Sequence, residues 1–181
     1  MPEQPMPKSY LSAAEIAAAP EVHVRHPFNP ASDAYLRSLG RFAGLQRVAL
    51  TLARVPPGRE SFIYHSHERH EEFLFILSGR GRAEIGGETI EVGPGDFMGF
   101  TAPSVAHHLT NPYEEDLVYL MGGEHGGFDI GNFPRVGKRV IFEGERIQML
   151  DEKDLQPMSF EQWLPEGLPE AHRGSAPKKE A

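Results

Sequence analysis

Short apolar runs bounded by turn residues recur along most of this chain, and the pattern predicts strands rather than long helices. Residues 46–55 alternate larger apolar side chains with smaller ones, which is typical of a half-buried strand. Residues 72–78 form a continuous apolar run that ends at Ser78-Gly79, which indicates a buried strand. Further strands are expected at residues 61–67, 82–85, 88–92, 97–100, 107–111, 117–121, 128–133 and 138–142.

One short helix is expected near the N-terminus. Ser12 and Glu15 have the spacing of a capping box, and Pro20 ends the helical segment. Nowhere does a strand alternate with a long helix, which argues against a parallel α/β sheet. The pattern therefore predicts an all-β domain, a sandwich or a barrel.

Two segments carry the candidate chemistry. His65 and His67 project from one face of an extended strand because strand side chains alternate with a period of two. Glu72 opens the apolar strand that follows, and a buried carboxylate needs a partner, which a divalent cation shared with the imidazoles would provide. If His107 faces inward from its own strand, the set offers three nitrogens and one oxygen.

The same residues resemble the two motifs of the cupin family. The first motif is a glycine, His-x-His, three or four residues, a glutamate, six residues and a glycine; residues 58–79 follow it, with Glu72 as the glutamate. The second motif ends in a histidine, three residues and an asparagine, which His107 and Asn111 fit. The spacing before the first histidine is one residue longer than usual, and serine and valine replace the glycine of the second motif.

The resemblance implies the cupin-type double-stranded β-helix, a jelly-roll barrel, with one divalent metal ion per chain. Its ligands would be His65, His67, Glu72 and His107. Such a set suits Fe, Mn, Ni, Co or Zn, and the ligand types do not rank these metals.

The domain organisation follows from the same patterns. We expect residues 1–44 to form an N-terminal arm with the short helix, and residues 45–145 to form the barrel. Residues 146–181 are polar and proline-rich, so we expect a C-terminal extension whose last part, 175–181, is disordered.

Composition narrows the possible functions. A chain of 181 residues suits one domain, and a net charge of −8 with scattered Lys and Arg disfavours nucleic-acid binding. The absence of cysteine excludes disulfides, thiolate zinc sites and a cysteine nucleophile. No apolar run has the length of a signal peptide or a membrane span, so we expect a cytoplasmic protein that does not bind membranes.

Three side chains adjoin the predicted ligands in the sequence. Glu71 and His108 alternate with ligand positions, so we expect both on the outer face in solvent. His70 lies in the loop between the ligand strands, either as an exposed residue or as a hydrogen-bonding partner of a ligand. It is also the only nearby candidate for a catalytic general base.

The outward side of the strand at 72–78 is apolar as well, through Phe73, Phe75 and Leu77. A strand that is apolar on both faces is covered on both faces, here by the N-terminal arm or by a second subunit. We expect a homodimer, because a large uncovered apolar patch is rare on a monomer.

Three functions fit these features. The first is a metal-dependent enzyme acting on a small organic molecule in the barrel; we favour a dioxygenase, because an iron site with open positions can hold an organic chelate and O₂ together. The second is a non-catalytic protein that binds or senses a small carboxylate or sugar, since no proton-transfer group other than His70 is evident. The third is a cupin isomerase or lyase. The sequence does not indicate the substrate.

Overall fold

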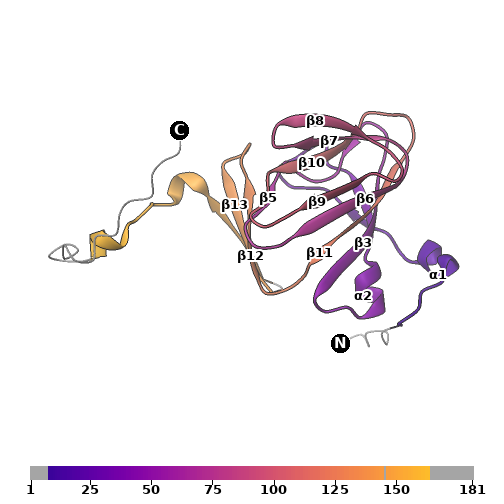
Figure 1. Ribbon diagram of the computed structural model, residues 1–181, viewed down its shortest axis with the longest axis horizontal. Coiled ribbons are helices and arrows are strands. Elements are labelled where there is room, and N and C mark those ends of the chain that lie inside the picture. Colours follow the sequence, from indigo (N-terminus) through magenta and orange to yellow (C-terminus); the bar gives the residue numbers. More distant parts are fainter. Residues whose placement is uncertain (1–7, 145, 164–181) are drawn as a thin grey trace.

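The computed structural model describes residues 8–144 and 146–163, which form three antiparallel sheets and a few short helices (Figure 1). The strands are β1 (Val22–Val24), β2 (Ala34–Arg37), β3 (Val48–Val55), β4 (Arg59–Glu60), β5 (Ser66–His67), β6 (Glu72–Ser78), β7 (Gly81–Ile85), β8 (Glu88–Val92), β9 (Phe97–Phe100), β10 (His107–Asn111), β11 (Leu117–Glu124), β12 (Phe128–Phe133), β13 (Lys138–Glu143) and β14 (Arg146–Asp151). The helices are α1 (Ala13–Ala18), α2 (Leu39–Ala43) and the 3₁₀ turns η1 (Glu152–Asp154) and η2 (Phe160–Trp163).

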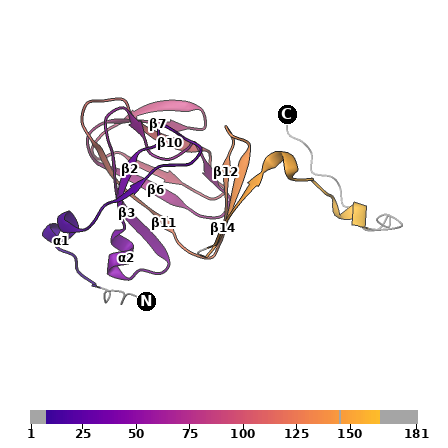
Figure 2. The same cartoon turned by 180° about the vertical axis from the view of Figure 1, so that it is seen from behind.

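The sheets are arranged as two facing layers with a third sheet at one end. Sheet A has the order β1-β2-β3-β11-β6-β9, sheet B the order β4-β10-β7-β8, and sheet C the order β14-β13-β12-β5. Figures 1 and 2 show sheets A and B packed face to face, with β12, β13 and β14 beside one end of them. The all-β architecture that the strand pattern predicts is confirmed, and it is the jelly-roll barrel that the resemblance implies.

The main core lies between sheets A and B. Its largest fully buried side chains are Val55, Ile76, Leu117 and Tyr119, which are at most 1% exposed. A smaller cluster of Ile63, Phe133 and Val140 lies against sheet C, with Phe142 packed on it. Burial of these apolar side chains is the principal stabilising contribution, and it fixes which strand faces point inward.

The predicted strand at 61–67 is wrong as a continuous element. The chain leaves sheet B after β4, where the Ser61 amide still donates to the Leu109 carbonyl at 2.9 Å, and joins sheet C at β5. Residues 61–64 cross between the two sheets, so no single ladder can pair them. Phe62 and Ile63 instead turn toward the space beside sheet C.

Strand β11 is longer than predicted and runs through Gly122 and Gly123 to Glu124. The glycines allow β6 to approach closely: a Cβ at Gly123 would lie 2.3 Å from the Glu71 carbonyl oxygen, and one at Gly122 would lie 2.6 Å from the Phe73 ring. The pairing of β11 with β6 brings the start of β6, and hence Glu72, to its position opposite Gly123.

The N-terminal arm contains the predicted short helix as α1, and also β1, β2 and α2, which the sequence pattern did not indicate. Ser12 Oγ accepts a hydrogen bond from the Glu15 amide at 3.2 Å, and the Glu15 carboxylate accepts one from the Ser12 amide at 2.9 Å, so the predicted capping box is confirmed. After α1, strands β1 and β2 extend the edge of sheet A. None of the helices in the described ranges is long and apolar enough to cross a membrane.

Beyond the predicted boundary at residue 145, β14 pairs with β13 along its whole length. The division into arm, barrel and C-terminal extension stays a prediction, and the expected disordered end at 175–181 lies outside the described residues.

Candidate metal centre

The four predicted ligand side chains come from separate elements and meet at one place inside the barrel. His67 ends β5, Glu72 begins β6 and His107 begins β10. His65 joins them because it exchanges two backbone hydrogen bonds with His107, at 3.1 and 2.7 Å. The strand pairing therefore sets the spacing of the imidazoles.

Distances within this cluster suit a single ion. Glu72 Oε2 lies 3.1 Å from His107 Nε2, 3.6 Å from His67 Nε2 and 3.9 Å from His65 Nε2. Ligand atoms bound at about 2.0–2.2 Å to one ion are themselves roughly 3–4 Å apart. The ligand atoms of His65, His67 and Glu72 lie within 4.8 Å of one another, and His107 joins this group through its 3.1 Å contact with Glu72. The four side chains are at most 19% exposed.

Each imidazole has a hydrogen-bond acceptor behind it. The Nδ1 atoms of His65 and His107 face the carbonyl oxygens of Ile63 and Val105 at 2.8 and 3.1 Å, and Nδ1 of His67 faces Asp129 Oδ2 at 2.6 Å. Nδ1 must carry a proton to satisfy these acceptors, which leaves the Nε2 lone pairs directed at the Glu72 carboxylate.

Titration of these groups does not remove the unfavourable contact between the imidazole lone pairs and the Glu72 carboxylate. Burial lowers the pKa of His65 to about 4, against the smaller opposing effect of Glu72, so this imidazole is neutral near pH 7. For Glu72, burial opposes ionisation, but its contacts with His107, His65 and His67 outweigh burial and lower its pKa, so the carboxylate is ionised. The result is an anion facing imidazole lone pairs, a donor set chemically suited to a divalent cation.

Asp129, on β12, contacts a candidate ligand and is a site residue that the sequence analysis missed. Its side chain is 0% exposed, and besides His67 it accepts hydrogen bonds from the amides of Arg69 and His70 at 2.9 and 3.3 Å. Burial opposes its ionisation, but these contacts lower its pKa. A lone Asp between Phe128 and Ile130 in an apolar run was the available signal.

His70 and His108 have different surroundings. His70 lines the pocket described below, with Nδ1 3.8 Å from Asp129 Oδ2 and Nε2 3.0 Å from the Gly126 carbonyl oxygen. The predicted solvent exposure of His108 is wrong, because it is 7% exposed. Its Nε2 lies 3.2 Å from Glu60 Oε2, and burial lowers its pKa.

A pocket of about 330 Å³ opens beside the candidate metal centre. Sheet A contributes Thr51 and Met121 to one wall. The mouth carries Glu71 and Glu124, and both side chains are exposed. The opposite wall is apolar and comes from the crossing segment and sheet C; its members are Phe62, Phe133, Val140 and Phe142. Volumes of this order are typical of small-molecule sites.

Solved structures share this architecture. A protein from Acidithiobacillus ferrooxidans, provisionally named a sugar phosphate isomerase, is 32% identical with a TM-score of 0.80, over 84% of this chain and 97% of that one. A sugar phosphate isomerase from a cupin superfamily, from Silicibacter pomeroyi, is 19% identical with a TM-score of 0.68, over 78% and 91%. The polyketide cyclase RemF from Streptomyces resistomycificus is 17% identical with a TM-score of 0.53, over 87% and 96%, which shows a shared fold.

At the sequence level, a family model described as a cupin domain matches residues 51–123, the span that holds all four candidate ligands. Asp129 and most of the apolar pocket wall lie beyond that match. No protein in the curated comparison matches this chain. The motifs, the barrel and the first of these structural relatives agree, and the chain belongs to the cupin family.

Proposed function

We propose that this cupin is a metal-dependent enzyme that acts on a small organic molecule held in the pocket beside the metal. One observation carries the proposal: three imidazoles, fixed by acceptors behind Nδ1, direct Nε2 at one buried carboxylate. Such an arrangement of acceptors is costly without a cation between them.

His65, His67, Glu72 and His107 would hold the ion, and Asp129 would orient His67. When bound, a divalent metal at this place supplies Lewis-acid polarisation of a substrate oxygen. The identity of the metal stays open among Fe, Mn, Ni, Co and Zn.

The pocket residues assign the remaining roles. The apolar wall positions the substrate and excludes water from the reacting end. His70 lines the pocket, and we assign to its Nδ1 the uptake or delivery of a proton, because its Nε2 lies 3.0 Å from the Gly126 carbonyl oxygen. This supports an isomerase or lyase, a class also favoured by the name of the 32% identical relative. A dioxygenase remains the alternative reaction within the same proposal.

The direct test is turnover by protein reconstituted with each of the five metals. We would incubate it with hydroxyketones, hydroxy acids and catechols, recording products by NMR and O₂ uptake by electrode. We expect product without O₂ uptake, and loss of turnover in Glu72→Gln and His70→Asn. O₂ uptake coupled to product would identify the dioxygenase, and silence across the panel would favour a binding protein.

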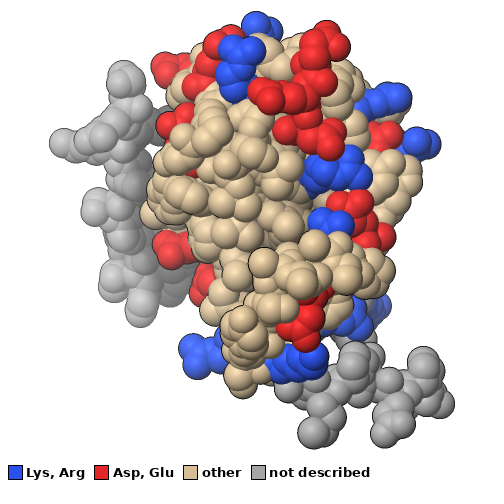
Figure 3. Space-filling view, turned by 90° about the vertical axis from the view of Figure 1, so that its right-hand side faces the viewer, with Lys and Arg blue, Asp and Glu red and all other residues tan. Residues whose placement is uncertain are grey.

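We also propose a homodimer formed through the outer face of sheet A. Phe97 is 64% and Leu77 41% exposed there, and Phe97 stacks on Phe73 with 5.9 Å between ring centroids. Figure 3 shows a broad area without charged side chains on the side of the molecule turned to the viewer. A second subunit would bury this apolar face.

A further inference from the structure

The wall of the pocket that comes from the crossing segment and sheet C is apolar and aromatic. Phe62, Phe133 and Phe142 come from two different parts of the fold, and Val140 lies among them. Phe133 is 7% and Val140 2% exposed, so these two belong to a packed wall. Side chains of this kind stabilise an apolar ligand surface and offer no hydrogen bond to a hydroxyl or a phosphate.

Cationic side chains are missing from the pocket. No lysine or arginine within residues 8–144 and 146–163 lines it. Those at the nearby β12–β13 turn are paired elsewhere: Arg135 with Glu84, and Lys138 with Asp151 at 2.5 Å. A phosphate is ordinarily held by arginine, lysine or a cluster of backbone amides, because its charge must be compensated once water is removed.

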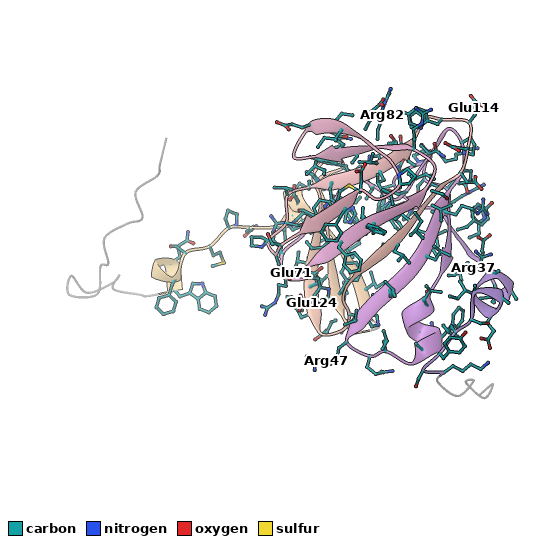
Figure 4. The ribbon with its side chains drawn as sticks, turned by 45° about the vertical axis from the view of Figure 1, so that its right-hand side comes forward. Arg37, Arg47, Glu71, Arg82, Glu114 and Glu124 are labelled. Carbon is teal, nitrogen blue, oxygen red and sulfur yellow. The ribbon has the colours of Figure 1, made fainter. Side chains whose placement is uncertain are left out.

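The mouth of the pocket is acidic instead. Glu71 and Glu124 both line it, and Figure 4 shows these two side chains close together where β6 begins and β11 ends. Arg47, labelled in the same view, lines an adjoining hollow that shares His70 and Glu124 with the pocket, but it is not among the residues that line the pocket itself. A dianionic ligand would therefore meet two carboxylates before it reached the metal ligands.

The two remaining histidines of the pocket do not supply the missing charge. Burial lowers the pKa of His26, which packs edge-on against Phe133 with 5.1 Å between centroids, so this imidazole favours the neutral form. Nε2 of His70 is 3.0 Å from the Gly126 carbonyl oxygen, and its Nδ1 lies 3.8 Å from Asp129 Oδ2. Neither histidine is the permanently charged side chain that ordinarily holds a phosphate.

Resting on the function proposed above, we propose that the substrate is a small, uncharged molecule with a mainly apolar body and an oxygen donor at one end, and that phosphorylated sugars are rejected. The volume of about 330 Å³ lies at the lower end of the range for ligand pockets, which suits a small molecule such as a substituted single ring. The oxygen donor would lie toward Glu72 and the ring toward Phe142.

Titration calorimetry on the full-length, metal-loaded protein tests this with three probes. Maltol is a neutral hydroxyketone ring, glucose is neutral and polar, and glucose 6-phosphate differs from glucose only by the phosphate. We expect maltol to bind at least about tenfold more tightly than glucose 6-phosphate, with glucose between them. Tighter binding of glucose 6-phosphate, or no binding of maltol at millimolar concentration, would overturn the inference.

Single substitutions, each with a matched control, test which pocket residues account for the preference for maltol. Phe142→Ser should weaken maltol binding by about tenfold, whereas Phe128→Ser, on the same sheet but outside the pocket, should leave it unchanged. Thr51→Lys places a cation in the pocket and keeps the test informative if Phe142→Ser fails to fold. Thr51→Lys should raise the affinity for glucose 6-phosphate relative to glucose at least about fivefold. If the variant still binds glucose 6-phosphate more weakly than glucose, the absence of a cation is not the reason for its rejection.

Elemental analysis of the same samples separates the two proposals. Protein that takes up no metal contradicts the proposed function. Metal-loaded protein that prefers glucose 6-phosphate contradicts only the assignment of the substrate class.

Discussion

At the scale of single residues, the orientation of the candidate ligands depends on what lies behind them. Two of the three Nδ1 atoms face backbone carbonyls, which substitution cannot remove, but His67 depends on the side chain of Asp129. A carboxylate behind a metal-binding imidazole fixes the ring and raises its basicity. Asp129 is therefore the positioning residue most open to test.

Asp129→Asn keeps the shape of the side chain but removes its charge. Either the amide nitrogen or the amide oxygen can then face His67 Nδ1, so the ring is held less firmly. We expect metal affinity to fall by about 10–100-fold, measured by competition with a chelator. Asp151→Asn, which breaks only a surface pair with Lys138, serves as the control. Equal metal affinities in the two variants would show that Asp129 does not help to hold the metal.

His108 is a buried imidazole that the candidate site does not use, and it makes the stability of the fold pH-dependent. Burial lowers its folded-state pKa below the ordinary 6.5. As the pH falls below 6.5, the unfolded chain takes up a proton that the folded chain resists, so the free energy of unfolding falls. The slope from one such group is at most about 1.4 kcal/mol per pH unit.

His108→Gln should therefore reduce the loss of stability between pH 7.5 and 5.5, measured by urea unfolding of metal-free protein. The exposed His125→Gln variant should show the same loss as wild type. An unchanged pH dependence in His108→Gln would show that folding does not shift the pKa of this imidazole.

The sequence predicted individual residues well where spacing alone decided their direction. His65, His67, Glu72 and His107 converge because a period of two and the strand pairing leave little freedom. His108 was misplaced because alternation says only that it leaves the barrel interior, not that Glu60 and its neighbours cover it. Asp129 is 62 residues from His67, and no local pattern connects them.

At the scale of elements, the pairing of β11 with β6 positions Glu72. Gly123 lies opposite Glu72, and the Glu71 carbonyl oxygen occupies the space that a side chain would need. This contact involves backbone on β6, which cannot move without shifting Glu72 itself.

Gly123→Ala should therefore destabilise the fold by about 2 kcal/mol or more and weaken metal binding as well, measured by urea unfolding and chelator competition. Gly93→Ala is the matched control, because the nearest atom to its added Cβ is a flexible carbon of Arg80 at 4.0 Å. Wild-type metal affinity in Gly123→Ala would mean that β6 adjusts without moving Glu72.

Most strands were predictable because turn glycines and prolines separate them. The prediction of one strand at residues 61–67 was wrong for a physical reason. Where the chain passes from sheet B to sheet C its backbone has no continuous partner strand, although its side chains still alternate in the sequence. Pattern alone does not reveal that change of partner, which depends on β12, more than 60 residues later.

At the scale of the whole molecule, the outer face of sheet A predicts self-association. Phe97→Glu should shift the chain from dimer to monomer at micromolar concentration in sedimentation velocity, because a charge on this face would be buried without a partner. Ile90→Glu, on the 48% exposed Ile90 of sheet B, should stay dimeric. A monomeric wild-type protein would refute the dimer.

The central claim is that four side chains gather around one metal ion, and adjacent histidines test it most directly. We would load wild type, His107→Gln and His108→Gln with metal, compete each with a chelator and measure bound metal by mass spectrometry. We predict about one equivalent in wild type and in His108→Gln, and at least a tenfold loss of affinity in His107→Gln. Equal retention by both variants, or no metal in wild type, would contradict the account.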